Sequence, residues 1–334
     1  MTYRFALLGC GQIGPRHAVQ MARLGELIAV CDVDRQKADV LALQYGCIAV
    51  YSLDALLKLT EKFDLVSICT PNYLHAPHSI ACLKAGVHVI CEKPMTISTA
   101  DALLVLAAVK SSGKKFFVVK QNRYNPPVAM LKGLLDRNAL GHVHSFQVNC
   151  FWNRTAGYYG SGWKGKKDLD GGILFTQFSH FIDLLIWFIG EPENAGTIKR
   201  NFLLGDKIEF EDTGASLIIM KSGAIGTIQF TITAFAKNME GSITIFGEKG
   251  TVKIGGEYLN TLEHFEVKNE EKPAMPSGRG ENDYGSYKGS MSNHDKVYEN
   301  VIMALDNREH QLVEGEEAAR TIKMIELLYR PEQF

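Results

Sequence analysis

Five short apolar runs, separated by longer segments with helical spacing, constrain the fold of this chain more than any other feature. The runs are rich in β-branched residues and occupy residues 5–9, 28–31, 65–70, 87–91 and 116–119. Apolar residues recur with the period of an α-helix in the segments between them, residues 13–24, 36–45, 52–59, 75–85 and 99–111. This alternation predicts an α/β Rossmann domain with a doubly wound parallel sheet, because parallel strands need helical crossovers.

A change of pattern after about residue 122 predicts a second domain. Asn125-Pro126-Pro127 interrupts regular structure, and six or seven runs that alternate apolar and polar residues follow between residues 143 and 267. We therefore predict a first domain at residues 1–122 and a second, α+β domain at residues 123–334 with a large, mostly antiparallel sheet. Residues 269–293, rich in Gly, Ser, Pro and charge, predict a loop that is mobile or orders over a ligand or a neighbouring subunit.

The overall composition excludes several classes of function. The 334 residues are 46% hydrophobic, which fills two cores, and 36 basic against 37 acidic residues give no basic field for nucleic acid. Seven cysteines without a C-x-x-C pair predict reduced thiols and no metal site. The most apolar segment, residues 173–189, is short for a membrane span, and the first residues lack the features of a secretory signal. We expect a cytoplasmic protein without a membrane or nucleic-acid partner.

The hexapeptide Gly9-Cys10-Gly11-Gln12-Ile13-Gly14 lies between a predicted strand and a predicted helix, the context in which G-x-G-x-x-G indicates a dinucleotide site. Gly9 suits the tight turn, Gly11 admits the pyrophosphate to the backbone, and Gly14 lets helix and strand pack closely. Free N–H groups at the start of the helix then bind the phosphates.

Two charged residues at the second strand end bear on which dinucleotide binds. Asp32 follows the second apolar run, a position from which a carboxylate accepts hydrogen bonds from the adenosine ribose and repels a 2′-phosphate. Arg35 lies close enough in sequence to oppose this preference. The balance predicts NAD as the cofactor.

Two further strand ends carry candidate residues. Thr70-Pro71-Asn72 and His75 follow the third run, where they either border the nicotinamide ribose or only begin a helix. Glu92-Lys93-Pro94 ends the fourth run, in the crevice where open parallel sheets bind ligands, and a lysine there is a candidate for proton chemistry. The predicted cofactor-binding residues are Gly9, Gly11, Gln12, Ile13, Gly14, Asp32, Arg35, Thr70, Pro71, Asn72, His75, Glu92, Lys93 and Gln121.

Three features together resemble the glucose–fructose oxidoreductase and inositol dehydrogenase (Gfo/Idh/MocA) family: the glycine-rich turn, Glu92-Lys93-Pro94, and Gly171-Gly172 before a helix that carries His180. The resemblance spans nearly the whole chain and implies an oxidoreductase. It places Lys93 beside the nicotinamide, implies a cis bond before Pro94, and turns His180 toward the sugar hydroxyl that loses hydride. Lys93 and His180 are therefore the implied catalytic residues.

The family has an aspartate one helical turn before this histidine, whereas the chain has Thr176, so the usual three-residue relay is incomplete. Thr176, His180 and Asp183 are spaced i, i+4 and i+7, which predicts one polar helix face with Gln177 beside it. An unperturbed histidine titrates near about 6.5, whereas the pKa of Lys93 must fall by roughly three units, about 4 kcal/mol, to make it a base at neutral pH. We expect His180 to be the base and Lys93 to orient the hydroxyl or relay its proton.

Within the family, residues 151–167 resemble those of members that oxidise C3 of UDP-N-acetylglucosaminuronic acid. Local cations suit its diphosphate and carboxylate, and aromatic faces suit its rings. The resemblance implies formation of the 3-keto sugar in the synthesis of a diacetamido uronic acid for the O-antigen or another surface polysaccharide, while a solvated basic loop is the alternative. The predicted substrate-binding residues are Lys93, Arg154, Tyr158, Tyr159, Trp163, Lys164, Thr176, Gln177, His180, Tyr287 and His294.

Other functions remain open from the sequence. A dehydrogenase of a cyclitol or free sugar would turn over without a nucleotide handle, and the family also admits relatives that cleave glycosides and use NAD only transiently. A non-catalytic, NAD-binding regulator would need neither Lys93 nor His180. The resemblance leaves open whether 2-oxoglutarate serves as a second substrate that re-oxidises bound NADH. We expect a homo-oligomer, a dimer or tetramer, formed through one face of the large sheet.

Overall fold

Short, mostly apolar strands form a seven-stranded sheet in the computed structural model of the chain. The sheet has the order β16-β6-β5-β4-β1-β2-β3, and every pair is parallel except β6 with β16. The order from β3 to β6 is that of a dinucleotide-binding Rossmann domain, so the predicted doubly wound parallel sheet is confirmed. The strands are β1 (Tyr3–Leu8), β2 (Gly25–Cys31), β3 (Ile48–Val50), β4 (Leu65–Ile68), β5 (His88–Cys91), β6 (Phe116–Val118) and β16 (Val313–Glu314).

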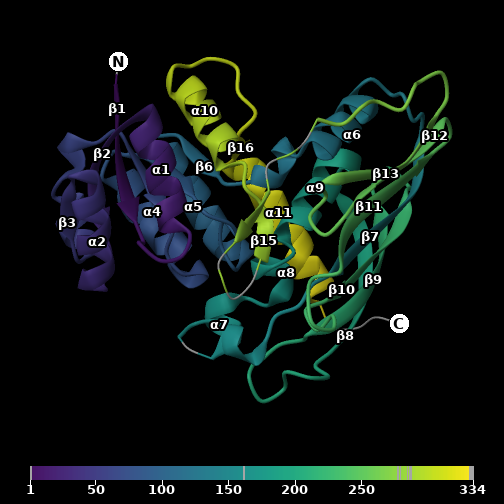
Figure 1. Cartoon of the computed structure of the whole chain (residues 1–334), viewed down its shortest axis with the longest axis horizontal. Helices are drawn as coiled ribbons and strands as arrows, with labels where there is room; N and C mark the ends of the chain where they lie inside the picture. Colours follow the sequence, from purple (N-terminus) through teal and green to yellow (C-terminus); the bar gives the residue numbers. More distant parts are fainter. Residues whose placement is uncertain are drawn as a thin grey trace. The chain divides into compact units, whose positions relative to one another are not determined.

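Helices pack against this sheet and bury its apolar strands. Helices α1 to α4 pack against its strands, and α5 packs against α4 (Figure 1). Ser98 caps α5, since its Oγ accepts the amide of Asp101 at 3.0 Å. The helices are α1 (Gly14–Leu24), α2 (Arg35–Tyr45), α3 (Leu53–Leu57), α4 (His75–Lys84), α5 (Thr99–Ser112), α10 (His294–Leu305) and α11 (Gly315–Leu328), with the 3₁₀ turns η1 (Thr60–Lys62) and η2 (Asn72–Leu74).

The chain divides into two units, and the structure describes residues 2–160, 162–276, 278, 280–283, 285 and 288–330 of it. The first unit combines Met1–Lys120 with His294–Ile322, and the second combines Gln121–Asn293 with Lys323–Phe334. The predicted division after residue 122 differs from this arrangement. The chain returns to the first unit because α10 buries Tyr298 against Phe5 of β1, with ring centroids 6.3 Å apart.

The second unit contains a large sheet of the order β13-β12-β11-β7-β10-β9-β8. Only β7 and β10 pair in parallel, so the predicted mostly antiparallel sheet is confirmed. The strands are β7 (Val143–Phe151), β8 (Pro192–Arg200), β9 (Thr213–Met220), β10 (Ile225–Thr231), β11 (Glu240–Gly247), β12 (Gly250–Gly255) and β13 (Thr261–Val267). The remaining elements are η3 (Gln121–Tyr124), α6 (Pro126–Asp136), η4 (Ala156–Tyr159), α7 (Lys167–Asp170), α8 (Ile173–Thr176), α9 (Ser179–Ile189), β14 (Glu281–Asp283) and β15 (Lys288–Met291).

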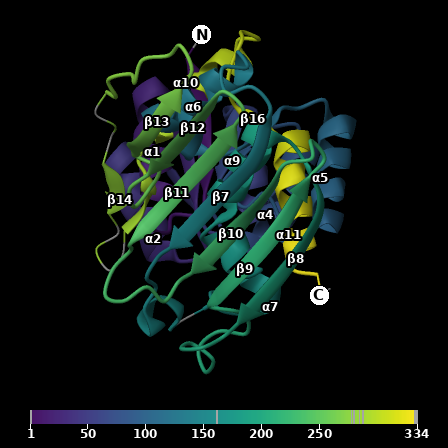
Figure 2. The same ribbon diagram turned by 90° about the vertical axis from the view of Figure 1, so that its right-hand side faces the viewer.

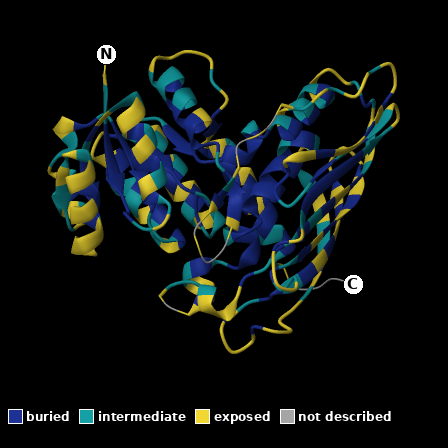
Figure 3. Cartoon of the chain, in the orientation of Figure 1, coloured by how far each residue is buried: buried dark blue, intermediate teal, exposed yellow. Residues whose placement is uncertain are grey.

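The two faces of the large sheet differ in burial. Residues of β9 and β10 alternate between buried and exposed, which gives the banded colouring in Figure 3. Helix α9 packs against β7 and α6 against β12. Figure 2 shows the opposite face of the seven strands, with no helix of the described chain in front of it. The difference in burial between the two faces follows from the period-2 alternation of apolar residues in the sequence.

The apolar segment that carries His180 forms two helices where the sequence predicted one. Helix α8 ends where two successive amides both donate to the carbonyl of Ile173, at 2.9 and 3.0 Å. The chain bends by 52° between Lys167–Thr176 and Ser179–Ile189. The predicted single polar face is wrong because Thr176 and His180 lie on different helices.

Two smaller predictions also need correction. One of the alternating runs predicted to be strands, residues 198–204, belongs to β8, which ends at Arg200. The Asp212 carboxylate accepts the amides of Phe202, Leu203 and Leu204 and holds them in a turn. Part of the expected loop at residues 269–293 forms the antiparallel pair β14 and β15. Among the described residues, no single helix has the length and composition to cross a membrane, although the bent pair of Lys167–Thr176 and Ser179–Ile189 passes that test together.

Candidate active site

The carboxyl ends of four neighbouring strands of the first sheet meet at one edge. Strand pairing places Leu8 beside Cys31 and Ile68, and Ile68 beside Cys91. The residues that follow at the same edge are Gly9, Asp32, Cys69 and Glu92. Open parallel sheets bind ligands at this edge, next to the point where the strand order reverses, here between β1 and β4.

The glycine-rich turn leaves no room for side chains at two of its glycines. Gly9 has a φ of 104°, and a Cβ there would lie 2.6 Å from the carbonyl carbon of Cys69. A Cβ on Gly14 would collide with the carbonyl oxygen of Gly9, whereas one on Gly11 would meet no atom within 4 Å. No described side chain caps the start of α1. The turn therefore fits a pyrophosphate at Gly11 and at the amides of the helix start.

Asp32 holds the glycine-rich turn from the end of β2. Its Oδ2 accepts the amide of Cys10 at 2.7 Å, and its Oδ1 accepts the amide of Asp34 at 2.9 Å. The Arg35 guanidinium carbon lies 4.3 Å from the centre of the Tyr51 ring. Asp32 thus keeps the position predicted for a ribose contact, and Arg35 stacks on an aromatic ring.

The loop after β4 is tied to the Lys93 loop by His75. The Nδ1 atom of His75 lies 2.6 Å from the carbonyl oxygen of Pro94, and Nε2 lies 2.8 Å from that of Thr70. His75 is buried at the start of α4, directly after the 3₁₀ turn that begins at Asn72. The sequence left two roles open for these residues: to border the nicotinamide ribose or only to begin a helix. The contacts of His75 favour the second role, because His75 begins α4 and connects the two loops.

Glu92 and Lys93 differ in burial after β5. The Lys93–Pro94 bond is cis, as the family resemblance implied, and Lys93 is half-buried. The Glu92 carboxylate is buried: its Oε1 lies 2.8 Å from Nε2 of His17, and its Oε2 accepts the amide of Lys93 at 3.1 Å. The predicted contact of Glu92 with the cofactor is replaced by contacts inside the first unit.

His294 was predicted to bind substrate but is buried beside Glu92 in the first unit. Its Nε2 lies 3.4 Å from Oε1 of Glu92, and its ring packs edge-on against His17. The reason is that His294 begins α10, whose apolar face is buried. The ligand atoms of His17, Glu92 and His294 lie within 4.8 Å of one another, but His17 and Glu92 already bind each other, and no metal site was predicted. Tyr287 lies outside the described residues.

The second unit gathers five predicted substrate residues into what we call the Tyr158 cluster: Arg154, Tyr158, Tyr159, Lys164 and Gln177. The Nζ of Lys164 lies 3.9 Å and the guanidinium carbon of Arg154 5.6 Å from the centre of the Tyr158 ring. The amide of Gln177 donates to the hydroxyls of Tyr159 at 3.3 Å and Tyr158 at 3.5 Å. Burial, the largest cause, lowers the pKa of Lys164, Asp170 opposes this shift, and Arg154 adds to it.

Asp170 supports the cluster and was missed by the sequence analysis. Its carboxylate is fully buried, accepts the amide of Gly165 at 2.8 Å and accepts the hydroxyl of Thr176. Thr176 occupies the position where the family has aspartate. Its hydroxyl donates to the Asp170 carboxylate of α7, so a carboxylate is still present next to this position. The acidic Asp168 and Asp170 before Gly171-Gly172 were the available signal.

The polar residues on and around α9 have different partners. Asp183, which the sequence placed on a polar helix face, forms a bidentate ion pair with Arg123 at 2.9 Å for both contacts. His180 is buried in the same helix. Gln121, predicted to contact the cofactor, is buried in η3 of the second unit, and Trp163 is half-buried in the turn before α7.

Family models match both units of the chain. Residues 3–120 match the oxidoreductase family, NAD-binding Rossmann fold (GFO_IDH_MocA), and residues 132–333 match the C-terminal alpha/beta domain of the same family. The chain belongs to the Gfo/Idh/MocA oxidoreductase family. The predicted family and the predicted NAD cofactor are therefore confirmed.

Solved structures of other family members resemble the whole chain. The WlbA dehydrogenase from Bordetella pertussis, in complex with NADH and UDP-GlcNAcA, is 31% identical, with a TM-score of 0.88 over 99% of this chain and 96% of that one. The WlbA dehydrogenase from Chromobacterium violaceum, with the same ligands, is 34% identical, with a TM-score of 0.87 over 98% and 93%. D-glucoside 3-dehydrogenase from Escherichia coli is 27% identical over 68% of this chain, which spans 66% of that relative.

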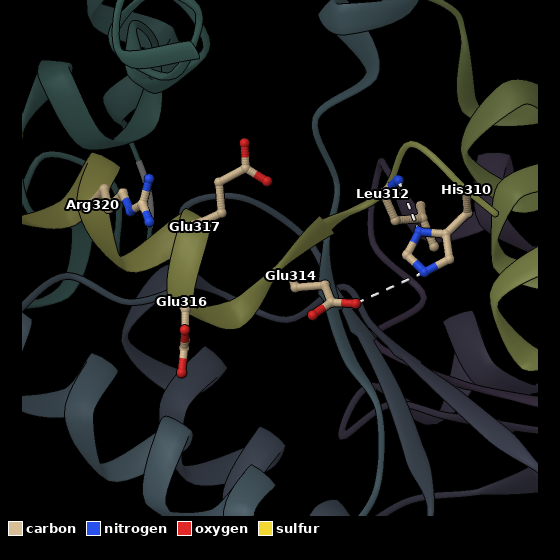
Figure 4. A pocket seen from close by; sticks show the side chains of 6 residues that line it. All are labelled: His310, Leu312, Glu314, Glu316, Glu317 and Arg320. Atoms are coloured by element: carbon tan, nitrogen blue, oxygen red, sulfur yellow. Dashed lines mark hydrogen bonds and ion pairs between the residues drawn. The ribbon is translucent and has the colours of Figure 1, made fainter. Parts of the chain in front are cut away.

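A cavity of about 340 Å³ lies away from these residues. It is lined by β16, by the residues just before it and by the start of α11. None of the predicted site residues lines it, and Figure 4 shows carboxylates from Glu314, Glu316 and Glu317 around it. Such an acidic lining does not suit an anionic dinucleotide or sugar nucleotide.

Replacing Asp32 by alanine should weaken NAD binding about 10- to 100-fold, because a charge-assisted hydrogen bond to the ribose contributes roughly 1.5–3 kcal/mol. The loss of charge should also reduce discrimination against NADP. Calorimetric titration with both dinucleotides measures the effect. Asp34→Ala removes an exposed carboxylate that pairs with Lys37 at the start of α2, so it is the matched control. An unchanged affinity ratio in Asp32→Ala would contradict the assignment.

Proposed function

We propose that the chain catalyses the NAD-dependent oxidation of the C3 hydroxyl of UDP-N-acetylglucosaminuronic acid to the 3-keto sugar. The product serves the synthesis of a diacetamido uronic acid for a surface polysaccharide. The Tyr158 cluster is the observation that carries this proposal, because it combines aromatic faces with two cations.

The cluster has the chemistry that an anionic sugar nucleotide needs. Arg154 and Lys164 flank the same ring, and Arg154 also lies 5.0 Å from the ring of Trp152. Two like charges this close repel each other, and an anion between them relieves the repulsion. A neutral cyclitol or free sugar gains nothing from such a pair. The two WlbA dehydrogenases, whose structures hold UDP-GlcNAcA and NADH, support the same substrate.

The proposed roles divide the chemistry between two residues. NAD, when bound to the first unit, would supply the acceptor for the hydride from C3. His180 takes the proton of the C3 hydroxyl, since a histidine is the side chain that most often acts as a general base. Lys93 orients and polarises that hydroxyl. Asp170 and Thr176 lie in the segment that precedes His180, where they hold α8 in place.

A ligand panel tests the substrate assignment. The protein is titrated, with NADH present, with UDP-N-acetylglucosaminuronic acid, UDP-glucose, inositol and glucose. We expect the UDP-linked uronic acid to bind at least tenfold more tightly than the other three. A preference for inositol or glucose would favour the dehydrogenase of a cyclitol or free sugar, and binding without turnover of any sugar would favour a regulator.

Replacing Lys164 by methionine should raise the KM for the UDP-linked substrate about 10- to 100-fold, with kcat nearly unchanged, because the lost contact is charge-assisted and remote from the reacting carbon. Steady-state kinetics measure the KM for the UDP-linked substrate and kcat separately. The control is Lys268→Met, which removes an exposed lysine from the turn after β13. A KM within twofold of the wild-type value would remove Lys164 from the substrate site.

The exposed face of the large sheet supports the expected homo-oligomer. Ile198, Leu217, Ile219 and Ile225 are exposed on β8 to β10, and Leu217 is 54% accessible. An apolar patch of this kind indicates a protein interface, and the same patch on a second copy closes it. We expect light scattering to show a dimer or tetramer that Leu217→Glu with Ile225→Glu dissociates. Leu43→Glu, on the exposed face of α2, is the control and should leave the assembly intact.

2-Oxoglutarate as a second substrate that re-oxidises bound NADH stays a prediction.

A further inference from the structure

Tyr329 and Glu211 cap the start of α8 in the second unit, although both lie far from it in the sequence. Tyr329 follows α11, and Glu211 lies shortly before β9. The Tyr329 hydroxyl accepts the amide of Leu174 at 3.1 Å and donates to Oε1 of Glu211 at 2.5 Å. The Glu211 carboxylate also accepts the amide of Ile173. These are the first two amides of α8, which a helix cannot satisfy by itself, so the pair supplies the missing acceptors.

The same tyrosine accounts for the glycine at position 172. Gly172 has a φ of 110°, and a Cβ there would collide with the hydroxyl oxygen of Tyr329. The Tyr329 ring also stacks on Phe175 of α8, with ring centroids 6.0 Å apart and 19° between the planes. Glu211 is only 7% accessible, so little water competes for its hydrogen bonds. The start of α8 is therefore fixed by packing as well as by hydrogen bonds.

The other end of α8 leads to the Tyr158 cluster through Gln177. Gln177 directly follows α8, and its side-chain amide donates to the hydroxyls of Tyr158 and Tyr159. Its Oε1 is buried and has no hydrogen-bond partner within the described part of the chain, so this oxygen is left to accept from a ligand. Because α8 has only four residues, a shift at its start also moves Gln177.

We propose that Tyr329 and Glu211 are positioning residues: by capping α8 they hold Gln177 against the Tyr158 cluster, where its side-chain oxygen accepts a hydrogen bond from the sugar nucleotide. The inference rests on the proposed function for the identity of that ligand. Neither Tyr329 nor Glu211 needs to contact the ligand itself. The capping of α8 is testable without any sugar.

The protonation state of Glu211 sets the strength of this capping. Burial, the largest cause, raises the pKa of Glu211 to about 7, while the hydrogen bond from Tyr329, the charge of Lys199 and the amide of Ile173 oppose the shift. An ionised carboxylate accepts stronger hydrogen bonds than a neutral one, so the capping weakens as the pH falls through this pKa. The titratable groups that face the pair are Lys199 of β8 and Asp170 of α7.

Hydrogen exchange, followed by mass spectrometry of a peptide that spans residues 171–178, tests the capping in the ligand-free protein. Tyr329→Phe keeps the ring but loses the hydroxyl, and should speed exchange of this peptide about tenfold, the effect of one charge-assisted hydrogen bond. Tyr3→Phe removes a tyrosine–carboxylate hydrogen bond of the same 2.5 Å length from the first unit and is the matched control. Glu211→Gln carries the test if Tyr329→Phe does not fold. Unchanged exchange in the folded variant would overturn the proposal.

Kinetics with UDP-N-acetylglucosaminuronic acid separate positioning from a general loss of structure. Tyr329→Phe should raise the KM for this substrate about tenfold, while kcat and the KM for NAD stay within about threefold, because His180 lies on the separate helix α9. In the wild-type protein the substrate KM should rise as the pH falls from about 8 to about 6, whereas Glu211→Gln should show the raised value at every pH. Tyr3→Phe should match the wild-type protein. A pH-dependent substrate KM in Glu211→Gln, or equal rises in both KM values of Tyr329→Phe, contradicts the inference.

A double-mutant cycle tests whether the effect passes through Gln177. Gln177→Leu should raise the substrate KM about tenfold, and adding Tyr329→Phe to it should raise this KM less than about threefold further, since both changes remove the same contact. Fully additive effects would show that Tyr329 acts by another route and would overturn the proposal. Absence of turnover in the wild-type protein instead counts against the proposed function and leaves the hydrogen-exchange result standing.

Discussion

Replacing His180 by glutamine should lower the rate of hydride transfer about 10²- to 10⁴-fold, the range that a positioned general base contributes. Glutamine is close in size and polar, but it cannot accept a proton from the C3 hydroxyl. The buried position of His180 in α9 excludes bulk water as a ready substitute. Single-turnover formation of NADH measures the step without interference from product release.

The binding of both ligands separates this effect from misfolding. His180→Gln should bind NADH and the UDP-linked sugar within about threefold of the wild-type protein, since the lost interaction belongs to the transition state. His144→Gln, on an exposed position of β7, is the matched control and should retain full activity. A His180→Gln enzyme that binds both ligands and transfers hydride at nearly the wild-type rate would show that another group is the base.

Replacing Asp183 by alanine should lower the free energy of unfolding by about 3–5 kcal/mol, because it leaves the Arg123 guanidinium buried without its carboxylate. Both groups are buried, and the pair has two contacts of 2.9 Å. The guanidinium also lies 4.6 Å from the ring of Trp187, so its position is fixed on both sides. Urea unfolding, followed by circular dichroism, measures the loss.

An exposed ion pair in the same unit is the control for this prediction. Lys132 and Asp136 pair on the surface of α6, and Asp136→Ala should cost less than about 1 kcal/mol. The double variant Arg123→Met with Asp183→Leu should recover much of the stability lost in Asp183→Ala, since it removes both buried charges. A loss below about 1 kcal/mol in Asp183→Ala would mean that Arg123 finds water or another carboxylate.

The regular parts of the fold could be predicted because their signals are local. The first five apolar runs are strands, and the glycine-rich turn has the geometry expected from its spacing. The three-residue β3 and the two-residue β16 were missed, since so short a segment shows no period. The return of α10 to the first unit depends on packing between residues nearly 300 positions apart, such as Phe5 and Tyr298, which no local pattern reveals.

The candidate site shows the same limit at the level of single residues. The cations and aromatic residues of the Tyr158 cluster were expected from the family resemblance of residues 151–167, and the structure brings them together. The partners that decide protonation were not predicted: Asp183 binds Arg123, and Glu92 binds His17. In both pairs the residues are at least 60 positions apart, and each carboxylate had looked like a ligand contact when read with its neighbours alone.

The most direct test of the proposed reaction uses UDP-N-acetylglucosaminuronic acid that carries deuterium at C3. With NAD and the wild-type protein, we expect the deuterium to appear in the reduced cofactor and the sugar to become its 3-keto form, both detected by mass spectrometry. Reduced cofactor without deuterium would show that hydride leaves another carbon. Turnover of inositol or glucose, with none of the UDP-linked uronic acid, would contradict the substrate and leave only the family assignment.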